Sequence, residues 1–281
     1  MNDLLESFDW DQLSLEQLKR IQSRVSKAID LKQQALKTVQ TNSNPNQTYN
    51  YKATISQVFP HRLRSRLFEY QSCVFIISLG GKNFEEKRLR ATVQWIGEHF
   101  KTCVVLVADS IYRLTLEVRG QAKGNESLSK ALYAGQEFIN ENILLFEEYA
   151  KSCDFTFKLT SEIERQDNFE IYHPEFQGLY KTSKCFARLV NSFAETFLSR
   201  GEQAEVIESV VHNKRQLAID YLLEESALFT CLAEEGWPVF VYPGSIKTFE
   251  EIAEGLHPEV PFFLKHMIWV SLRLKQKGTS T

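Results

Sequence analysis

The sequence predicts an α/β protein with a mostly parallel sheet, and three features support this class. The segments 73–78 and 104–108 are nearly continuous apolar runs, as is typical of strands covered by helices on both faces. The segment between them carries apolar residues at helical spacing from Leu89 to Phe100. Long helical patterns and short apolar runs then alternate toward the C-terminus, which is the element order of an α/β fold.

The composition predicts one large folded core and limits the possible partners. The chain has 281 residues, of which 43% are hydrophobic, and a chain of this size buries roughly three-quarters of its surface on folding. The apolar runs are too short to cross a bilayer, and Asp3 and Glu6 occupy the place of a secretory leader's basic region. We therefore expect a cytoplasmic protein without a membrane contact. The net charge of −3 argues against bulk binding of DNA.

Residues 1–50 are expected to form an N-terminal extension separate from a main domain at residues 51–281. Ser14 and Gln17 form a capping box, and an apolar stripe follows at helical spacing as far as Leu36. Residues 41–50 are polar and uncharged, which is typical of a linker. The stripe of this amphipathic helix either packs on the main body or forms a homodimer contact.

The first elements of the main domain predict a βαβ unit. The strand ends at Ser78, residues 79–81 form a tight turn, and Asn83 is predicted to cap the following helix with Glu86 completing the capping box. The second strand ends at Asp109. A right-handed unit of this kind is the first half of a Rossmann-like domain.

The later elements extend the same architecture. Helical patterns cover approximately residues 125–150, 174–199 and 203–233. Apolar strand patterns cover residues 237–242 and 267–274.

Cysteine and histidine spacing predicts no metal site. The five cysteines include no C-x-x-C pair, and the six histidines include no H-x-x-x-H pair. We therefore expect reduced thiols and no structural zinc.

Three polar residues, Ser78, Asp109 and Tyr242, follow or end predicted strands, where α/β sheets bind ligands. The turn after Ser78 matches neither a dinucleotide-binding fingerprint nor a P-loop, and Ile76 excludes a nucleophile elbow. A serine before a helix N-terminus is a candidate nucleophile, because the helix amides favour developing negative charge. Such a serine more often serves only as a turn former.

Tyr221 and Glu225 are four residues apart and share one face of a predicted helix. Ala218, Leu222 and Leu228 lie on the same face, so it is expected to point inward. A buried carboxylate beside a phenol indicates acid–base chemistry or amine binding. Alternatively, Glu225 lies at the edge of the stripe in solvent, and Tyr242-Pro243-Gly244 is an ordinary turn.

Taken together, these pieces resemble the tRNA-dependent cyclodipeptide synthases. The resemblance rests on Ser78 after an apolar strand, Tyr221-x-x-x-Glu225, and Tyr242-Pro243, in this order and spacing, and on the segment 74–109. It covers about residues 55–275. No single motif is specific, but the ordered set is. Gly81, Tyr242 and Pro243 match the subfamily whose signature is a variable residue, Tyr and Pro.

The resemblance implies a Rossmann-like fold similar to the class I aminoacyl-tRNA synthetase catalytic domain. It also implies synthesis of a cyclic dipeptide, a 2,5-diketopiperazine, from two aminoacyl-tRNAs. In this family's ping-pong mechanism Ser78 would carry an aminoacyl and then a dipeptidyl group. Tyr221 and Glu225 would hold the α-amino group and relay protons, and Tyr242 would position the acyl group. No cofactor is implied, because a synthetase has already activated the substrates.

Further implications concern substrate binding. Five apolar residues fall where the family lines its first aminoacyl pocket: Val74, Ile76, Leu106, Ala108 and Leu228. We therefore expect a small or mid-sized uncharged first amino acid, with Gly81 and Pro243 also near the substrate. Phe176 stands where the family has a tyrosine.

The arginine-rich helix of better-known relatives is not matched, since residues 128–144 hold the single cation Lys130. The preferred candidates for tRNA contact are Lys87, Arg88 and Arg90 on the helix after Ser78. Arg62, Arg64 and Arg66 are the alternative, although charge runs are usually solvated faces.

Two other functions remain open at this stage. One is a non-catalytic module that binds tRNA or aminoacyl-tRNA on the same fold. The other is a hydrolase or nucleotide-binding enzyme, which the missing motifs disfavour.

Overall fold

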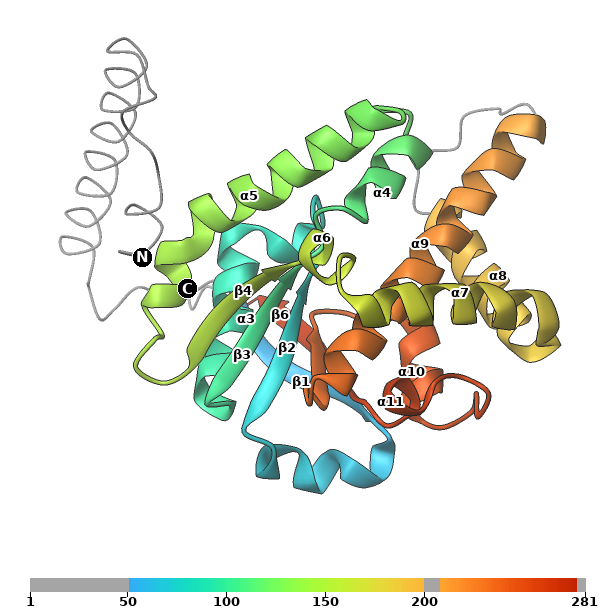
Figure 1. The fold of residues 1–281 in the computed structure, drawn as a ribbon. Helices are drawn as coiled ribbons and strands as arrows, with labels where there is room; N and C mark the ends of the chain where they lie inside the picture. The colour runs from blue at the N-terminus through green and yellow to red at the C-terminus, as the bar shows by residue number, and fades with distance from the viewer. Residues whose placement is uncertain (1–50, 200–207, 277–281) are drawn as a thin grey trace, which may run out of the picture. The chain divides into compact units, whose positions relative to one another are not determined.

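The computed structural model describes residues 51–199 and 208–276. The amphipathic helix, linker and dimer contact predicted for residues 1–50 lie outside the described residues. In the described part, helices cover both faces of a six-stranded sheet (Figure 1). None of the described helices has the length and apolar character that crossing a bilayer requires.

The sheet has the order β1-β6-β5-β2-β3-β4 and is parallel except at the β1–β6 pair. The strands are β1 (Tyr51–Phe59), β2 (Ser72–Ile77), β3 (Thr102–Val107), β4 (Asp154–Leu159), β5 (Val239–Tyr242) and β6 (Ile268–Gln276). This confirms the predicted α/β class and mostly parallel sheet. The sequence patterns missed β1 and β4, because edge strands are partly exposed and lack a continuous apolar run.

The strand order reverses direction at β2. From β2 the chain passes to β3 and then to β4, and it later returns to place β5 on the other side of β2 (Figure 1). The carboxyl ends of β2 and β5 therefore lie at a topological switch point. Ligands of open α/β sheets bind at this position.

The helices differ in places from the predicted ranges. They are η2 (His61–Glu69), η3 (Lys82–Phe84), α3 (Glu86–His99), α4 (Tyr112–Val118), α5 (Asn125–Glu147), α6 (Thr160–Ile163), α7 (Asp167–Thr182), α8 (Lys184–Ser199), α9 (Glu208–Glu234), α10 (Lys247–Ala253) and α11 (Phe262–Lys265). The single helix predicted over 174–199 is wrong, because the chain breaks at Ser183. The Ser183 hydroxyl accepts a hydrogen bond from the Phe186 amide at 3.2 Å and caps α8.

The predicted N-cap of α3 is also wrong. A short 3₁₀ turn, η3, occupies residues 82–84, and α3 begins at Glu86. Asn83 makes no capping bond. Its side-chain amide instead donates a hydrogen bond to the Pro243 carbonyl oxygen, in the turn after β5.

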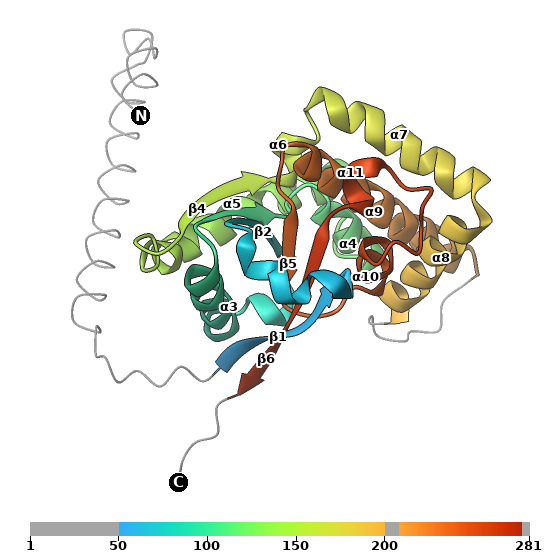
Figure 2. The same ribbon diagram turned by 90° about the horizontal axis from the view of Figure 1, so that it is seen from below.

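Alternate side chains of the central strands build two separate apolar layers. Val74 and Ile76 of β2 point to one face, which α4 and α6–α11 cover. Phe75 and Ile77 point to the other face, which α3 and α5 cover (Figure 2). The long helix α9 packs against α4, α7 and α8, and it brings its buried residues to the first face.

Candidate active site

Ser78 directly follows β2, at the carboxyl end of the strand and at the switch point. It is half-buried and begins a tight turn in which the Gly81 amide donates to the Ser78 carbonyl oxygen at 3.1 Å. Gly80 has a φ of +71° in this turn, a conformation that side-chain-bearing residues rarely adopt. The turn at residues 78–81 therefore fixes the backbone conformation of Ser78 at the end of β2.

Tyr242 reaches Ser78 from the neighbouring strand. It ends β5, and its hydroxyl lies 3.4 Å from Ser78 Oγ although 164 residues separate the two in sequence. The Tyr242 ring contacts the rings of Phe84 and Trp269, with centroid separations of 6.0 and 6.1 Å. These aromatic contacts limit the movement of the phenol that reaches Ser78.

Tyr221 and Glu225 come to the same place from α9. The Tyr221 hydroxyl donates to Glu225 Oε1 at 3.4 Å, and the nearby Ser78 side chain exerts a small lowering effect on the pKa of Tyr221. The Tyr221 ring packs on Phe193 and Phe197 of α8. The structure thus brings together the four residues that the sequence singled out, from β2, β5 and α9.

Burial dominates the electrostatics of this group. Glu225 is 4% exposed, so its placement at a solvated helix edge is wrong. Burial raises the pKa of Glu225 to about 8, against a smaller opposite effect of the hydrogen bond from Tyr221. Burial, and then the charge of Glu225, hold the pKa of Tyr221 well above its usual value. Glu225 Oε2 has no hydrogen-bond partner among the described residues.

The expected pocket residues all lie in one apolar layer beside these four. They are Val74, Ile76, Leu106, Ala108 and Leu228. All five are buried, and they share this layer with Tyr221 and with Phe176. Their role in holding an aminoacyl side chain stays a prediction.

The turn after β2 is joined to the turn after β5 through Asn83. Asn83 donates to the Pro243 carbonyl and accepts from the Arg88 guanidinium at 3.4 Å. A Cβ on Gly81 would lie 3.0 Å from both the Ser78 carbonyl oxygen and the Phe84 ring, so this turn is closely packed. Sequence reasoning missed the role of Asn83, since its spacing to Glu86 matches a capping box.

A hollow of about 540 Å³ lies next to this junction. Its lining includes Asn83, Arg88 and Pro243, together with residues of β1 and β6. Arg88 also lies over the Tyr51 ring at 5.1 Å.

The three cations preferred for tRNA contact have different surroundings. Lys87 is exposed, Arg88 is half-buried, and Arg90 is 19% exposed and paired with Glu148, directly after α5. Lys130 of α5 pairs with a neighbour on its own helix, Glu126, at 2.7 Å. Arg62, Arg64 and Arg66 are exposed on η2, where Arg66 bonds Glu69 and Arg64 bonds the Ser56 carbonyl.

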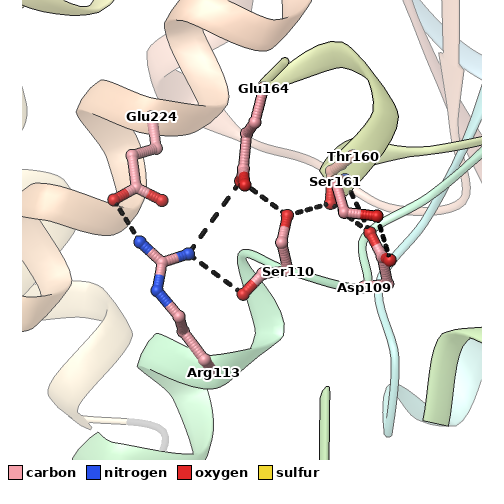
Figure 3. A network of polar contacts seen from close by, with 7 residues as sticks. All are labelled: Asp109, Ser110, Arg113, Thr160, Ser161, Glu164 and Glu224. Atoms are coloured by element: carbon pink, nitrogen blue, oxygen red, sulfur yellow. Dashed lines mark hydrogen bonds and ion pairs between the residues drawn. The ribbon is translucent and has the colours of Figure 1, made fainter. Parts of the chain in front are cut away.

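Asp109, the third polar residue at a strand end, serves a structural network. Figure 3 shows it beside α6, where it accepts hydrogen bonds from Thr160 Oγ1 at 2.8 Å and Ser161 Oγ at 2.6 Å. The Ser161 amide donates to it as well. Gly135 of α5 lies so close that a Cβ there would be 2.4 Å from the Asp109 Cβ. Asp109 thus fastens α6 to the end of β3.

The same network reaches the helix that carries Glu225. Arg113 of α4 donates to Glu224 Oε1 at 2.7 Å and to the Ser110 carbonyl at 3.0 Å, and it lies 3.9 Å from Glu164 (Figure 3). Ser110 Oγ donates to Glu164 at 2.5 Å. Because Glu224 directly precedes Glu225, this ion pair restrains the turn of α9 at the site.

Comparison with known proteins identifies the family. A sequence profile described as cyclodipeptide synthase matches residues 65–234, more than half of the chain. The chain belongs to the cyclodipeptide synthase family. Ser78, Tyr221 and Glu225 lie inside the matched segment, and Tyr242 and Pro243 lie beyond it. A search of curated protein sequences finds no match.

Solved structures of cyclodipeptide synthases share the fold. One from Fluoribacter dumoffii is 25% identical with a TM-score of 0.68, and the match covers 81% of this chain and 100% of the other. A Mycobacterium tuberculosis protein, described as related to type I tRNA synthetases, is 15% identical with a TM-score of 0.55 and 82% and 94% coverage. A synthase from Candidatus Glomeribacter gigasporarum, bound to Phe-tRNAPhe, is 15% identical with a TM-score of 0.56 and 78% and 94% coverage.

Proposed function

We propose that this cyclodipeptide synthase joins the amino acids of two aminoacyl-tRNAs through covalent intermediates on Ser78. The observation that carries the proposal is one half-buried serine 3.4 Å from the Tyr242 phenol and beside a second phenol, Tyr221, that bonds a buried carboxylate. The description of a related synthase bound to Phe-tRNAPhe supports aminoacyl-tRNA as the substrate class. Such substrates place the enzyme in the cytoplasm.

Three acyl transfers complete the reaction. Ser78 Oγ attacks the first ester carbonyl, the carbon–oxygen bond to the tRNA breaks, and the serine proton ends on the released ribose hydroxyl. The amine of aminoacyl-Ser78 then attacks the second ester and releases the second tRNA, which leaves dipeptidyl-Ser78. The terminal amine finally attacks the Ser78 ester, closes the ring and returns a proton to the serine oxygen.

Glu225 supplies the proton acceptor for the amines. Its pKa of about 8 keeps it largely protonated at pH 7 before substrate binds. An ammonium group near Oε2 lowers that pKa, because an opposite charge favours the ionised carboxylate. Glu225 then takes a proton from each attacking amine and passes it to the departing oxygen, first that of the second ribose and then Ser78 Oγ, while Tyr221 fixes its other oxygen.

The apolar layer beside Tyr221 supports an uncharged first amino acid. Val74, Ile76 and Leu228 bring no polar group that would hydrogen-bond a charged side chain. Tyr242 contacts the serine through its hydroxyl and two aromatic rings through its own ring, which suits it to position the acyl group.

Product analysis tests the catalytic proposal. The protein is expressed in a bacterial host, and mass spectrometry measures cyclic dipeptides in the medium. Wild type is expected to produce one or more, Ser78→Ala none, and Glu225→Gln about 10²-fold less or lower. Ser72→Ala, at the opposite end of β2, is the matched control and keeps full output. Equal output from Ser78→Ala and wild type would leave the non-catalytic binding module as the better proposal.

Lys87 is the best-placed cation for a tRNA phosphate, because it is exposed and lies two residues into α3. Product formation should fall steeply with salt, and Lys87→Gln should lower the slope of log kcat/KM against log salt by about 1. Lys151→Gln, an exposed lysine on the turn before β4, is the control. An unchanged slope in Lys87→Gln would reject this contact.

A further inference from the structure

A cluster of potential metal ligands lies outside the proposed active site. Cys185 of α8 has its Sγ 3.7 Å from His257 Nδ1, and Glu259 Oε1 lies 3.9 Å from the same ring nitrogen. All three ligand atoms lie within 4.8 Å of one another. His257 and Glu259 belong to the segment between α10 and α11, 72 residues and more from Cys185.

We propose that Cys185, His257 and Glu259 form a binding site for Zn²⁺. Zinc bonds of 2.0 to 2.3 Å at tetrahedral angles separate neighbouring ligand atoms by about 3.4 to 3.6 Å. The Sγ–Nδ1 and Oε1–Nδ1 separations exceed this range by a few tenths of an ångström, and the Sγ–Oε1 separation is at most 4.8 Å. Side-chain rotations would bring all three atoms to bonding distance of one ion. A thiolate, an imidazole and a carboxylate are all zinc ligands, and three of them leave a fourth position for water.

Neighbouring side chains orient the imidazole of His257 and the carboxylate of Glu259, as hydrogen-bonding partners do for the ligands of metal sites. His257 is 4% exposed, and its Nε2 lies 3.2 Å from Glu251 Oε2. A proton on Nε2 held by that carboxylate leaves the Nδ1 lone pair facing Cys185 and Glu259. Ser183 Oγ donates to Glu259 Oε1 at 2.9 Å, and Lys247 pairs with Glu251 at 3.3 Å.

Charge favours a metal over a reactive thiol at this position. A cysteine beside a histidine alone is the arrangement of an activated nucleophile. Here Glu259 approaches the same ring nitrogen as the thiol, so the imidazole faces two potential anions and not the thiol alone. A divalent cation between them neutralises both anions, while the Cys185 proton is released to solvent as the Zn–S bond forms.

The site would fasten the start of α8 to the α10–α11 segment. Farther along α8, Phe193 and Phe197 pack on Tyr221. The bound ion would therefore stabilise the helix that supports the active-site phenol. Spacing rules could not predict this site, since they consider ligands that are close in sequence.

Zinc binding to the purified full-length protein tests the proposal. Competition with a chromophoric chelator should show one tight Zn²⁺ per chain, and Cys185→Ser and His257→Gln should each weaken it by about 10²-fold or more. Cys185 is exposed, so its serine variant is expected to fold. His212→Gln, an exposed histidine on α9, should bind as wild type does. Equal zinc affinity of wild type and Cys185→Ser would overturn the site.

Thiol labelling separates the metal site from a free nucleophile. Cys185 is exposed and the other four cysteines are buried, so a thiol reagent applied to the native protein reports on Cys185. One equivalent of Zn²⁺ should suppress the labelling, and Co²⁺ should give the near-ultraviolet absorption of a cobalt–thiolate bond. Labelling that zinc leaves unchanged would support a free thiol and overturn the proposal. Neither measurement depends on cyclic dipeptide synthesis.

Discussion

The stability of the protein relative to its Glu225→Gln variant should fall as pH rises from 5 to 8, because the Glu225 carboxyl is buried. The folded protein holds the Glu225 proton up to a pKa of about 8, whereas the unfolded chain loses it near 4.5. Between these values the folded state binds more protons, so the free energy of unfolding falls as pH rises. This decrease in the free energy of unfolding is complete above pH 8, where folding must bury the ionised carboxylate.

The size of the effect follows from the two pKa values. Relative to low pH, where Glu225 is protonated in both states, its ionisation lowers the free energy of unfolding of wild type by about 3 kcal/mol at pH 7 and about 1 kcal/mol at pH 5. Below pH 4 the effect is almost nothing. Glu225→Gln removes the titration and keeps an oxygen that accepts the Tyr221 hydrogen bond. The variant should therefore gain stability relative to wild type by about 2 kcal/mol between pH 5 and pH 7, although it loses activity.

Urea denaturation of both proteins at pH 5, 6, 7 and 8 measures this difference. Taking the difference between the two proteins cancels other titrating groups, including Glu164 and Glu224, whose pKa values burial also raises. Glu85→Gln, at the exposed start of α3, should show no such trend. A stability difference that stays constant over this pH range would refute the burial of an ionisable Glu225.

Two further substitutions test the network at the end of β3. Gly135→Ala should lower stability by about 1–3 kcal/mol in thermal unfolding, because its Cβ would overlap Asp109. Gly178→Ala, with open space around it in α7, should instead leave stability unchanged or raise it by up to about 1 kcal/mol, and equal effects would count against the close approach. Arg113→Met should cost about 3 kcal/mol in urea denaturation, because Glu224 would remain buried without its partner. The double variant with Glu224→Met should recover most of this loss, and no recovery would reject the ion pair as the cause.

The local patterns of the sequence predicted the centre of the fold well. Continuous apolar runs identified β2 and β3, because a strand covered on both faces needs apolar side chains at every position. The i, i+4 spacing placed Tyr221 and Glu225 on one helical face. Local patterns failed at the edge strands β1 and β4, where half-exposed positions resemble a loop.

The site itself depends on contacts between distant segments. The sequence determined which side chains have the required chemistry, since residue type and spacing on one strand or helix are local properties. Only the tertiary structure decided that β5 lies beside β2, so that Tyr242 reaches Ser78 across 164 residues. Packing likewise decided that Glu225 is buried and that Cys185 meets His257. Burial and proximity arise from the packing of many elements together, which no short window of sequence contains.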